Sequence, residues 1–109
     1  MEQLEREKPG FGIEMATDEV GDPLLKLAGE LDMSSAEILR ETVDRVLAGN
    51  PTRIVFELSE LVFIDSSGIA VLILASNHVE KVELRNAQPI VRRVVEIAGL
   101  GDILWLGSS

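Results

Sequence analysis

The most informative stretch of the chain is Leu61-Val-Phe-Ile-Asp-Ser-Ser-Gly-Ile-Ala-Val-Leu-Ile-Leu-Ala75, in which two apolar runs meet at a polar node, residues 65–68. Asp and Ser directly before an apolar run are typical N-cap residues, because their side-chain oxygens accept the free amide protons of a first helical turn. The second run therefore predicts a helix over about residues 66–76. Two hydroxyls and a carboxylate would then lie at the positive end of a buried helix.

The segments around this stretch predict further strands. Alternating apolar residues over 11–16 and an apolar segment over 24–28 predict two strands joined as a hairpin. Residues 53–58, with their Ile-Val-Phe centre, predict an interior strand. Residues 81–85 predict a fourth strand, and residues 102–106 predict a short last strand or a packed tail.

Two more helices are expected, one on each side of the central stretch. The first has an apolar stripe made of Ala36, Leu39, Val43, Val46 and Leu47. Its start has two possible capping boxes, Ser34 with Glu37 or Asp32 with Ser35. The second begins at Pro89, a residue favoured at the first helical position. The whole pattern predicts a single α/β domain, a mixed sheet of four to five strands packed with about three helices.

Composition narrows the classes of function. The chain has 109 residues, no cysteine, one histidine and a formal net charge of −9. The negative charge disfavours nucleic acid and anionic lipid and favours basic protein partners. Neither a metal site nor a cofactor is expected. Residues 1–10 are polar and predict a flexible N-terminal arm rather than a signal peptide. The longest apolar run, residues 69–75, is too short to insert into a membrane, and a cytoplasmic protein is expected.

Three ordinary explanations of the node were weighed. A nucleophilic serine needs a base, but the single histidine, His78, lies about 18 Å from Ser66 along a helix, so the chain is not expected to be an enzyme. A nucleotide site lacks any glycine-rich phosphate fingerprint, and Asp65 would repel phosphate. Simple helix capping needs one of the three polar residues and leaves one hydroxyl without a role.

A serine phosphorylation switch uses the remaining hydroxyl. If Asp65 is the N-cap, Ser66 occupies the first helical position with its hydroxyl directed outward. A phosphoryl group would add about −1.5 to −2 charges there, which a helix N-terminus tolerates and a docked partner does not. Small residues such as Gly68 and Ala70 are expected to let a partner approach the first turn. Capping chemistry alone does not choose between Ser66 and Ser67.

Several short motifs, in order and with characteristic spacing, resemble one known family. They are Gly29-Glu-Leu-Asp32, Phe63-Ile-Asp-Ser-Ser-Gly68, Ala87-Gln-Pro-Ile-Val-Arg-Arg-Val94 and Ala98-Gly-Leu100. Together they resemble the STAS domain, specifically the small bacterial anti-sigma factor antagonists. The resemblance covers residues 11–106, nearly the whole chain.

The resemblance implies a regulator of transcription and stress response. Such a protein binds an anti-sigma factor, which is a serine kinase, and thereby releases a sigma factor. It implies that Ser66 is the phosphorylated serine and that a PP2C-type phosphatase resets it. The partner-binding residues implied by the motifs and the node are Asp32, Asp65, Ser66, Ser67, Gly68 and Ile69.

The sequence departs from the family pattern in the connection over residues 75–81. Relatives usually have a longer second helix and a glycine-rich turn there, so about five residues are missing on a side expected to be near the docking surface. This departure leaves the choice of partner open. The alternative is a non-switching accessory STAS subunit of a scaffold or lipid-transport assembly.

Overall fold

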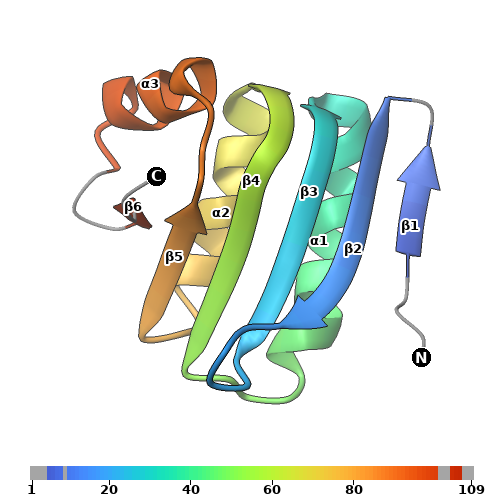
Figure 1. Cartoon of the computed structure of the whole chain (residues 1–109), viewed down its shortest axis with the longest axis vertical. Helices are drawn as coiled ribbons and strands as arrows, with labels where there is room; N and C mark the ends of the chain where they lie inside the picture. The colour runs from blue at the N-terminus through green and yellow to red at the C-terminus, as the bar shows by residue number, and fades with distance from the viewer. Residues whose placement is uncertain (1–4, 9, 101–103, 107–109) are drawn as a thin grey trace.

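The computed structural model describes residues 5–8, 10–100 and 104–106. It forms one mixed sheet in which the strands follow their order in the chain, β1-β2-β3-β4-β5-β6 (Figure 1). The strands are β1 (Glu5–Lys8), β2 (Phe11–Thr17), β3 (Pro23–Leu31), β4 (Arg53–Ile64), β5 (Lys81–Arg85) and β6 (Leu104–Leu106). The helices are α1 (Met33–Leu47), α2 (Ser66–Ser76) and α3 (Pro89–Ile97).

The pairing directions confirm the predicted mixed α/β sheet. Strands β1, β2 and β3 are antiparallel neighbours, and β3 to β6 run parallel. The hairpin of β2 and β3 is confirmed, and the three helices form where their apolar stripes and caps predicted them. The last predicted strand is present as β6, and its first residues, 102 and 103, lie outside the described residues.

The sixth strand is β1, which lies within the segment expected to be a polar arm. Residues 5–8 pair antiparallel with β2, from Glu5 opposite Glu14 to Lys8 opposite Phe11. An edge strand needs only the backbone groups of one neighbour, so a polar sequence can form it without an apolar face. The structure thus corrects the extent of the arm, and its flexibility stays a prediction.

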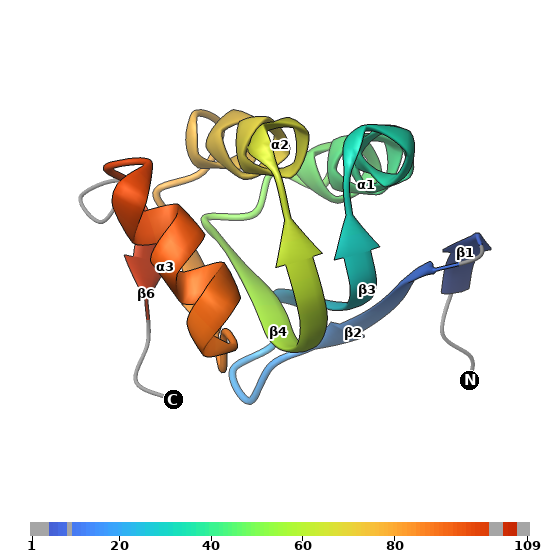
Figure 2. The ribbon, with the colours of Figure 1, turned by 90° about the horizontal axis from the view of Figure 1, so that it is seen from above.

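The helices are distributed unequally over the sheet. Figure 2 shows α1 and α2 side by side on one face, whereas α3 lies apart from them and contacts β4. Alternate strand residues face α1 and α2 and form the aliphatic core. Its fully buried side chains include Leu25, Leu39, Phe56, Leu72 and Leu84. The other sheet face, called the open face below, carries charged side chains such as Lys26 and Arg53.

The strand β4 is longer than predicted and brings two helix starts together. It continues from the expected residues 53–58 to Ile64, and it gains residues relative to β3 at two register shifts. With these shifts Leu31, the last residue of β3, pairs with Ile64, the last residue of β4. The helices that follow the two strands therefore begin next to each other at the carboxyl edge of the sheet.

Candidate functional site

The candidate site is the carboxyl edge of β3 and β4, where each strand passes into a helix through one aspartate. Asp32 follows β3 and Asp65 follows β4. Both residues have extended backbone angles, and both are the N-caps of their helices. The Asp65 amide donates to the carbonyl oxygen of Leu31 at 3.1 Å, which ties the two corners together.

The corner at Asp65 is capped as the sequence predicted. The Asp65 Oδ1 atom accepts hydrogen bonds from the amides of Ser67 at 2.8 Å and Gly68 at 3.3 Å. The first helical bond runs from the Ile69 amide to the Asp65 carbonyl oxygen at 3.0 Å. Ser66 is therefore the first helical residue, and its hydroxyl is not needed to cap the helix.

The two serines of the node differ in exposure. Ser66 is exposed and Ser67 is half-buried. Within the described part of the chain, neither hydroxyl makes a hydrogen bond. Capping chemistry alone left both serines open, whereas exposure favours Ser66 as the hydroxyl that a modifying protein could reach.

The corner at Asp32 is capped differently from the first predicted register. Asp32, not Ser34, is the N-cap, and its partner in the capping box is Ser35. Its Oδ1 atom accepts from the Ser34 amide at 3.0 Å and hydroxyl at 2.8 Å, and from the Ser35 amide at 3.1 Å. The Ser35 hydroxyl is buried and donates to the Glu30 carbonyl oxygen at 2.8 Å. The register of Ser34 with Glu37 is wrong because this buried hydroxyl also completes the end of β3.

Hydrogen bonds also set the charge of Asp32. The Ser34 hydroxyl, the Ser35 amide and further donors of this turn outweigh the effect of burial and lower the pKa of Asp32. The carboxylate thus stays ionised through a wide pH range. Asp32 and Asp65 place two acidic groups at one edge, beside the exposed Ser66.

Gly68 and Ile69 are buried rather than open to a partner. A Cβ atom on Gly68 would lie 2.6 Å from Leu31 Cγ and 2.9 Å from Ile64 Cγ1. The glycine therefore lets α2 approach the ends of β3 and β4, and its expected role as clearance for a partner is corrected. Ile69 is 7% exposed, so only a small part of its side chain reaches the surface.

That exposed part of Ile69 belongs to a shallow apolar groove between α2 and α3. The groove has a volume of about 270 Å³, and its lining residues are Ser66, Ile69, Val94, Ile97 and Ala98. Ile97 is 73% exposed on its rim. The sequence analysis assigned the α3 side chains to the core and so missed them. The available signal was the spacing of Ile90, Val94 and Ile97, a second apolar stripe beside the buried Val91 and Val95.

The remaining sequence features lie elsewhere. His78 is exposed beyond the far end of α2, and its Nδ1 atom lies 2.9 Å from the Leu74 carbonyl oxygen. The shortened connection between α2 and β5 is at the same far edge of the sheet (Figure 1), so it is not near Ser66 as expected. Among the described residues there is no cluster of potential metal ligands, and no helix is long and apolar enough to span a membrane.

Comparisons with known proteins point in one direction. The family model described as "Mlab, STAS domain" matches residues 15–106. An anti-sigma F factor antagonist of Lysinibacillus sphaericus is 33% identical over 101 residues, which cover 88% of this chain and 83% of the relative.

Two solved structures have similar folds. An anti-sigma factor antagonist from Mycobacterium paratuberculosis superposes with a TM-score of 0.82 at 24% identity, over 91% of this chain and 86% of that one. The Bacillus cell fate determinant SpoIIAA in its phosphorylated form gives a TM-score of 0.65 at 29% identity, over 91% and 92% of the two chains.

Proposed function

Because the chain belongs to the STAS domain family, we propose that it is an anti-sigma factor antagonist whose partner binding is switched off by phosphorylation of Ser66. The observation that carries the proposal is the exposed Ser66, which is the first residue of α2 and also lines the apolar groove. The name of the Lysinibacillus sphaericus relative and the phosphorylated form of SpoIIAA support it.

The groove and the node offer a partner two kinds of contact. Apolar side chains from α2 and α3 would be buried against the partner, with Ile97 as the most exposed of them. Asp32 and Asp65 would present negative charge beside the groove, which suits a basic partner surface. The partner is an anti-sigma factor that is itself a serine kinase and supplies the ATP. This chain is its substrate and carries no catalytic residue.

Phosphorylation would change binding and leave the fold intact. The capping hydrogen bonds of α2 go to Asp65 and not to Ser66, so the modification removes none of them. The helix N-terminus would stabilise the added charge by about 0.3 to 1 kcal/mol. A partner seated in the groove would have to desolvate a dianion next to Asp65. A loss of about 3 to 4 kcal/mol would weaken binding several hundred-fold.

Binding of the cognate anti-sigma factor to three variants tests the proposal. Ser66→Ala is expected to bind like the wild type, and Ser66→Asp to bind at least about a hundred-fold more weakly. Thr52→Asp is the matched control, since it adds the same charge at an exposed residue of the opposite sheet edge. Undiminished binding by Ser66→Asp would refute the switch. Equal losses for Ser66→Asp and Thr52→Asp would assign the effect to net charge.

A second candidate function is a non-switching accessory STAS subunit of a scaffold or lipid-transport assembly. It is favoured by the description of the matching family model, which names Mlab. The intact mass of the protein purified from its own cells separates the two functions. A phosphorylated fraction that disappears in Ser66→Ala supports the switch. Unmodified protein that co-purifies stoichiometrically with a membrane complex supports the accessory role. A PP2C-type phosphatase should remove the phosphate in the first case.

A further inference from the structure

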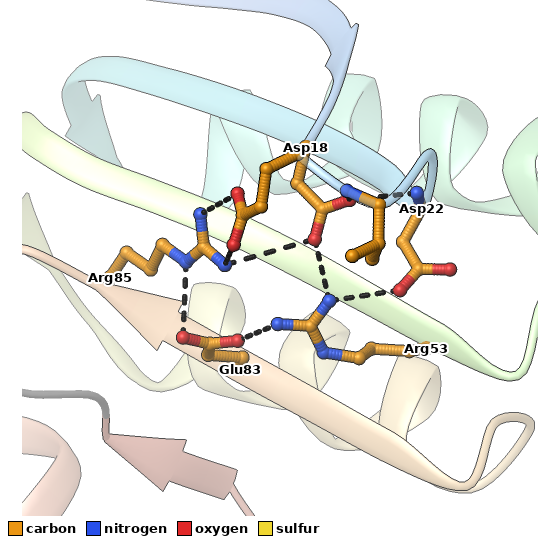
Figure 3. A network of polar contacts seen from close by, with 7 residues as sticks. Asp18, Asp22, Arg53, Glu83 and Arg85 are labelled. Atoms are coloured by element: carbon orange, nitrogen blue, oxygen red, sulfur yellow. Dashed lines mark hydrogen bonds and ion pairs between the residues drawn. The ribbon is translucent and has the colours of Figure 1, made fainter.

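The open face of the sheet carries a network of ionised side chains that is separate from the site at Ser66. The β2–β3 loop, residues 18–22, curls over this face and meets two arginines from β4 and β5 (Figure 3). The Arg53 Nη1 atom lies 2.6 Å from Asp18 Oδ2 and 2.9 Å from Asp22 Oδ2. Its Nη2 atom contacts Glu83. One arginine thus joins the loop to two strands.

The second arginine, Arg85, extends the network toward the tip of the loop. Its Nη1 and Nη2 atoms donate to the two carboxylate oxygens of Glu19 at 3.1 and 3.0 Å. Its Nε atom donates to Glu83 Oε2 at 3.0 Å, and its Nη2 atom lies 3.7 Å from Asp18 Oδ2. Glu83 therefore connects both arginines.

Asp18 links the attachment of the loop to its internal shape. Its Oδ1 atom accepts from the amides of Val20 at 3.0 Å and Asp22 at 2.8 Å, while its Oδ2 atom binds Arg53. The Asp18 amide donates in turn to the Asp22 carbonyl oxygen at 2.9 Å. A change that removes Arg53 or the charge on Asp18 should therefore loosen the loop as well as detach it.

Burial divides the network into an inner and an outer part. The Asp18 side chain is fully buried, and those of Glu83 and Arg53 are 7% and 20% exposed. Glu19, at the outer end, is 68% exposed. The network stands over a part of the sheet that α1 and α2 do not cover. Val55, on this face, is fully buried and yet not part of the core beneath the helices.

The balance of charge makes the network sensitive to acid. Four carboxylates face two guanidiniums, and Glu57, Lys26 and Lys81 are the other charged groups on the neighbouring strands. Burial would raise the pKa of Asp18, but Arg53 and the loop amides outweigh it and lower that pKa. Arg85 lowers the pKa of Glu19. Their stabilising contribution is present above the unfolded values of about 4 and is lost as the pH falls through the lower folded values.

We propose that the β2–β3 loop is a latch on the open face, which Arg53 holds closed and which opens locally in acid or without Arg53 while α2 stays folded. Opening would free the loop from β4 and β5 and expose the apolar strip around Val55. The inner part around Arg53 dominates, because its ion pairs are less screened by water and salt than the pair of Arg85 with Glu19.

Amide hydrogen exchange tests the latch, with protection factors corrected for the intrinsic pH dependence of exchange. The Asp18 and Asp22 amides report on the loop, and the Ile69 amide reports on α2 in the same sample. In Arg53→Met at pH 7, loop protection should fall by about tenfold while that of Ile69 changes less than about twofold. Lys26→Met, which removes a cation of the same face that lies only 3.9 Å from Glu14, should change neither.

Acidification of the wild type gives the second arm. From pH 7 toward pH 4 and below, loop protection should decline before that of Ile69, and this difference should shrink in Arg53→Met. Asp22→Asn, which keeps the side-chain size and removes one carboxylate of Arg53, is the milder variant if Arg53→Met fails to fold. Unchanged loop protection in both variants would overturn the proposal. So would parallel loss at Asp22 and Ile69 in acid, which would mean global unfolding.

Discussion

The two corners at the carboxyl edge have nearly the same backbone and opposite uses of their serines. At the first corner, Asp32 is the cap and the serine hydroxyls of Ser34 and Ser35 are both hydrogen-bonded. At the second corner, Asp65 is the cap and the hydroxyls of Ser66 and Ser67 have no hydrogen-bond partner among the described residues. The first corner is complete within the chain. The second keeps hydroxyl groups for a molecule outside it.

The third helical residue shows why the corners differ. It is Ser35 in α1, whose hydroxyl closes a capping box, and Gly68 in α2, whose missing side chain makes room for Leu31 and Ile64. A serine at this point of α2 would collide with the core. The second corner therefore cannot form the capping box of the first, and its cap depends on Asp65 alone.

Gly68→Ala is expected to have the largest effect on stability. The new Cβ atom would lie within 3 Å of buried side chains from two strands, and overpacking of this kind costs about 1 to 3 kcal/mol. Denaturation by urea, followed by circular dichroism, measures the loss. Gly49→Ala is the matched control, because its Cβ atom would make only an ordinary contact at 3.5 Å. A Gly68→Ala protein as stable as wild type would restore partner clearance as the reason for this glycine.

Serine-to-alanine substitutions at the two corners should have unequal effects. Ser35→Ala leaves the Glu30 carbonyl oxygen and the Asp32 amide without their side-chain partner, at a cost of about 1 to 2 kcal/mol. Ser67→Ala removes a hydroxyl that bonds to nothing described, and its effect should stay within about 0.5 kcal/mol. Urea midpoints of the two variants make the comparison. Equal losses would mean that Ser67 has a structural partner and that the contrast between the corners is false.

The elements were predictable because their signals are local. The cap at Asp65, the helix behind it and the order of strands and helices follow from residues within a few positions of one another. The first helix shows the limit of such signals. Ser34 with Glu37 satisfies the capping-box pattern as well as Asp32 with Ser35 does. The choice depends on the carbonyl oxygen of Glu30, which is placed by the end of a strand.

The features that the sequence did not predict depend on contacts between distant segments. The role of Gly68 became visible only with Leu31, which lies on another strand, and the groove needed α3 beside α2. The network around Arg53 joins residues about thirty positions apart in the chain. The pairing of β1 is a backbone contact that polar residues do not signal.

The smallest expected effect concerns Met33, the first helical residue of the first corner, which is 77% exposed. Met33→Ser gives this corner the same Asp-Ser-Ser sequence as the second, and its stability should change by less than about 0.5 kcal/mol. If an aspartate cap and a following serine were sufficient for the kinase, the variant would gain a second phosphate. We expect a single phosphate per chain, because the groove that leads to Ser66 is lined by α2 and α3 and not by α1. Intact mass after reaction with the kinase counts the phosphates, and Met33→Ser combined with Ser66→Ala should then carry none. Two phosphates on Met33→Ser would show that the cap, and not the groove, selects the serine.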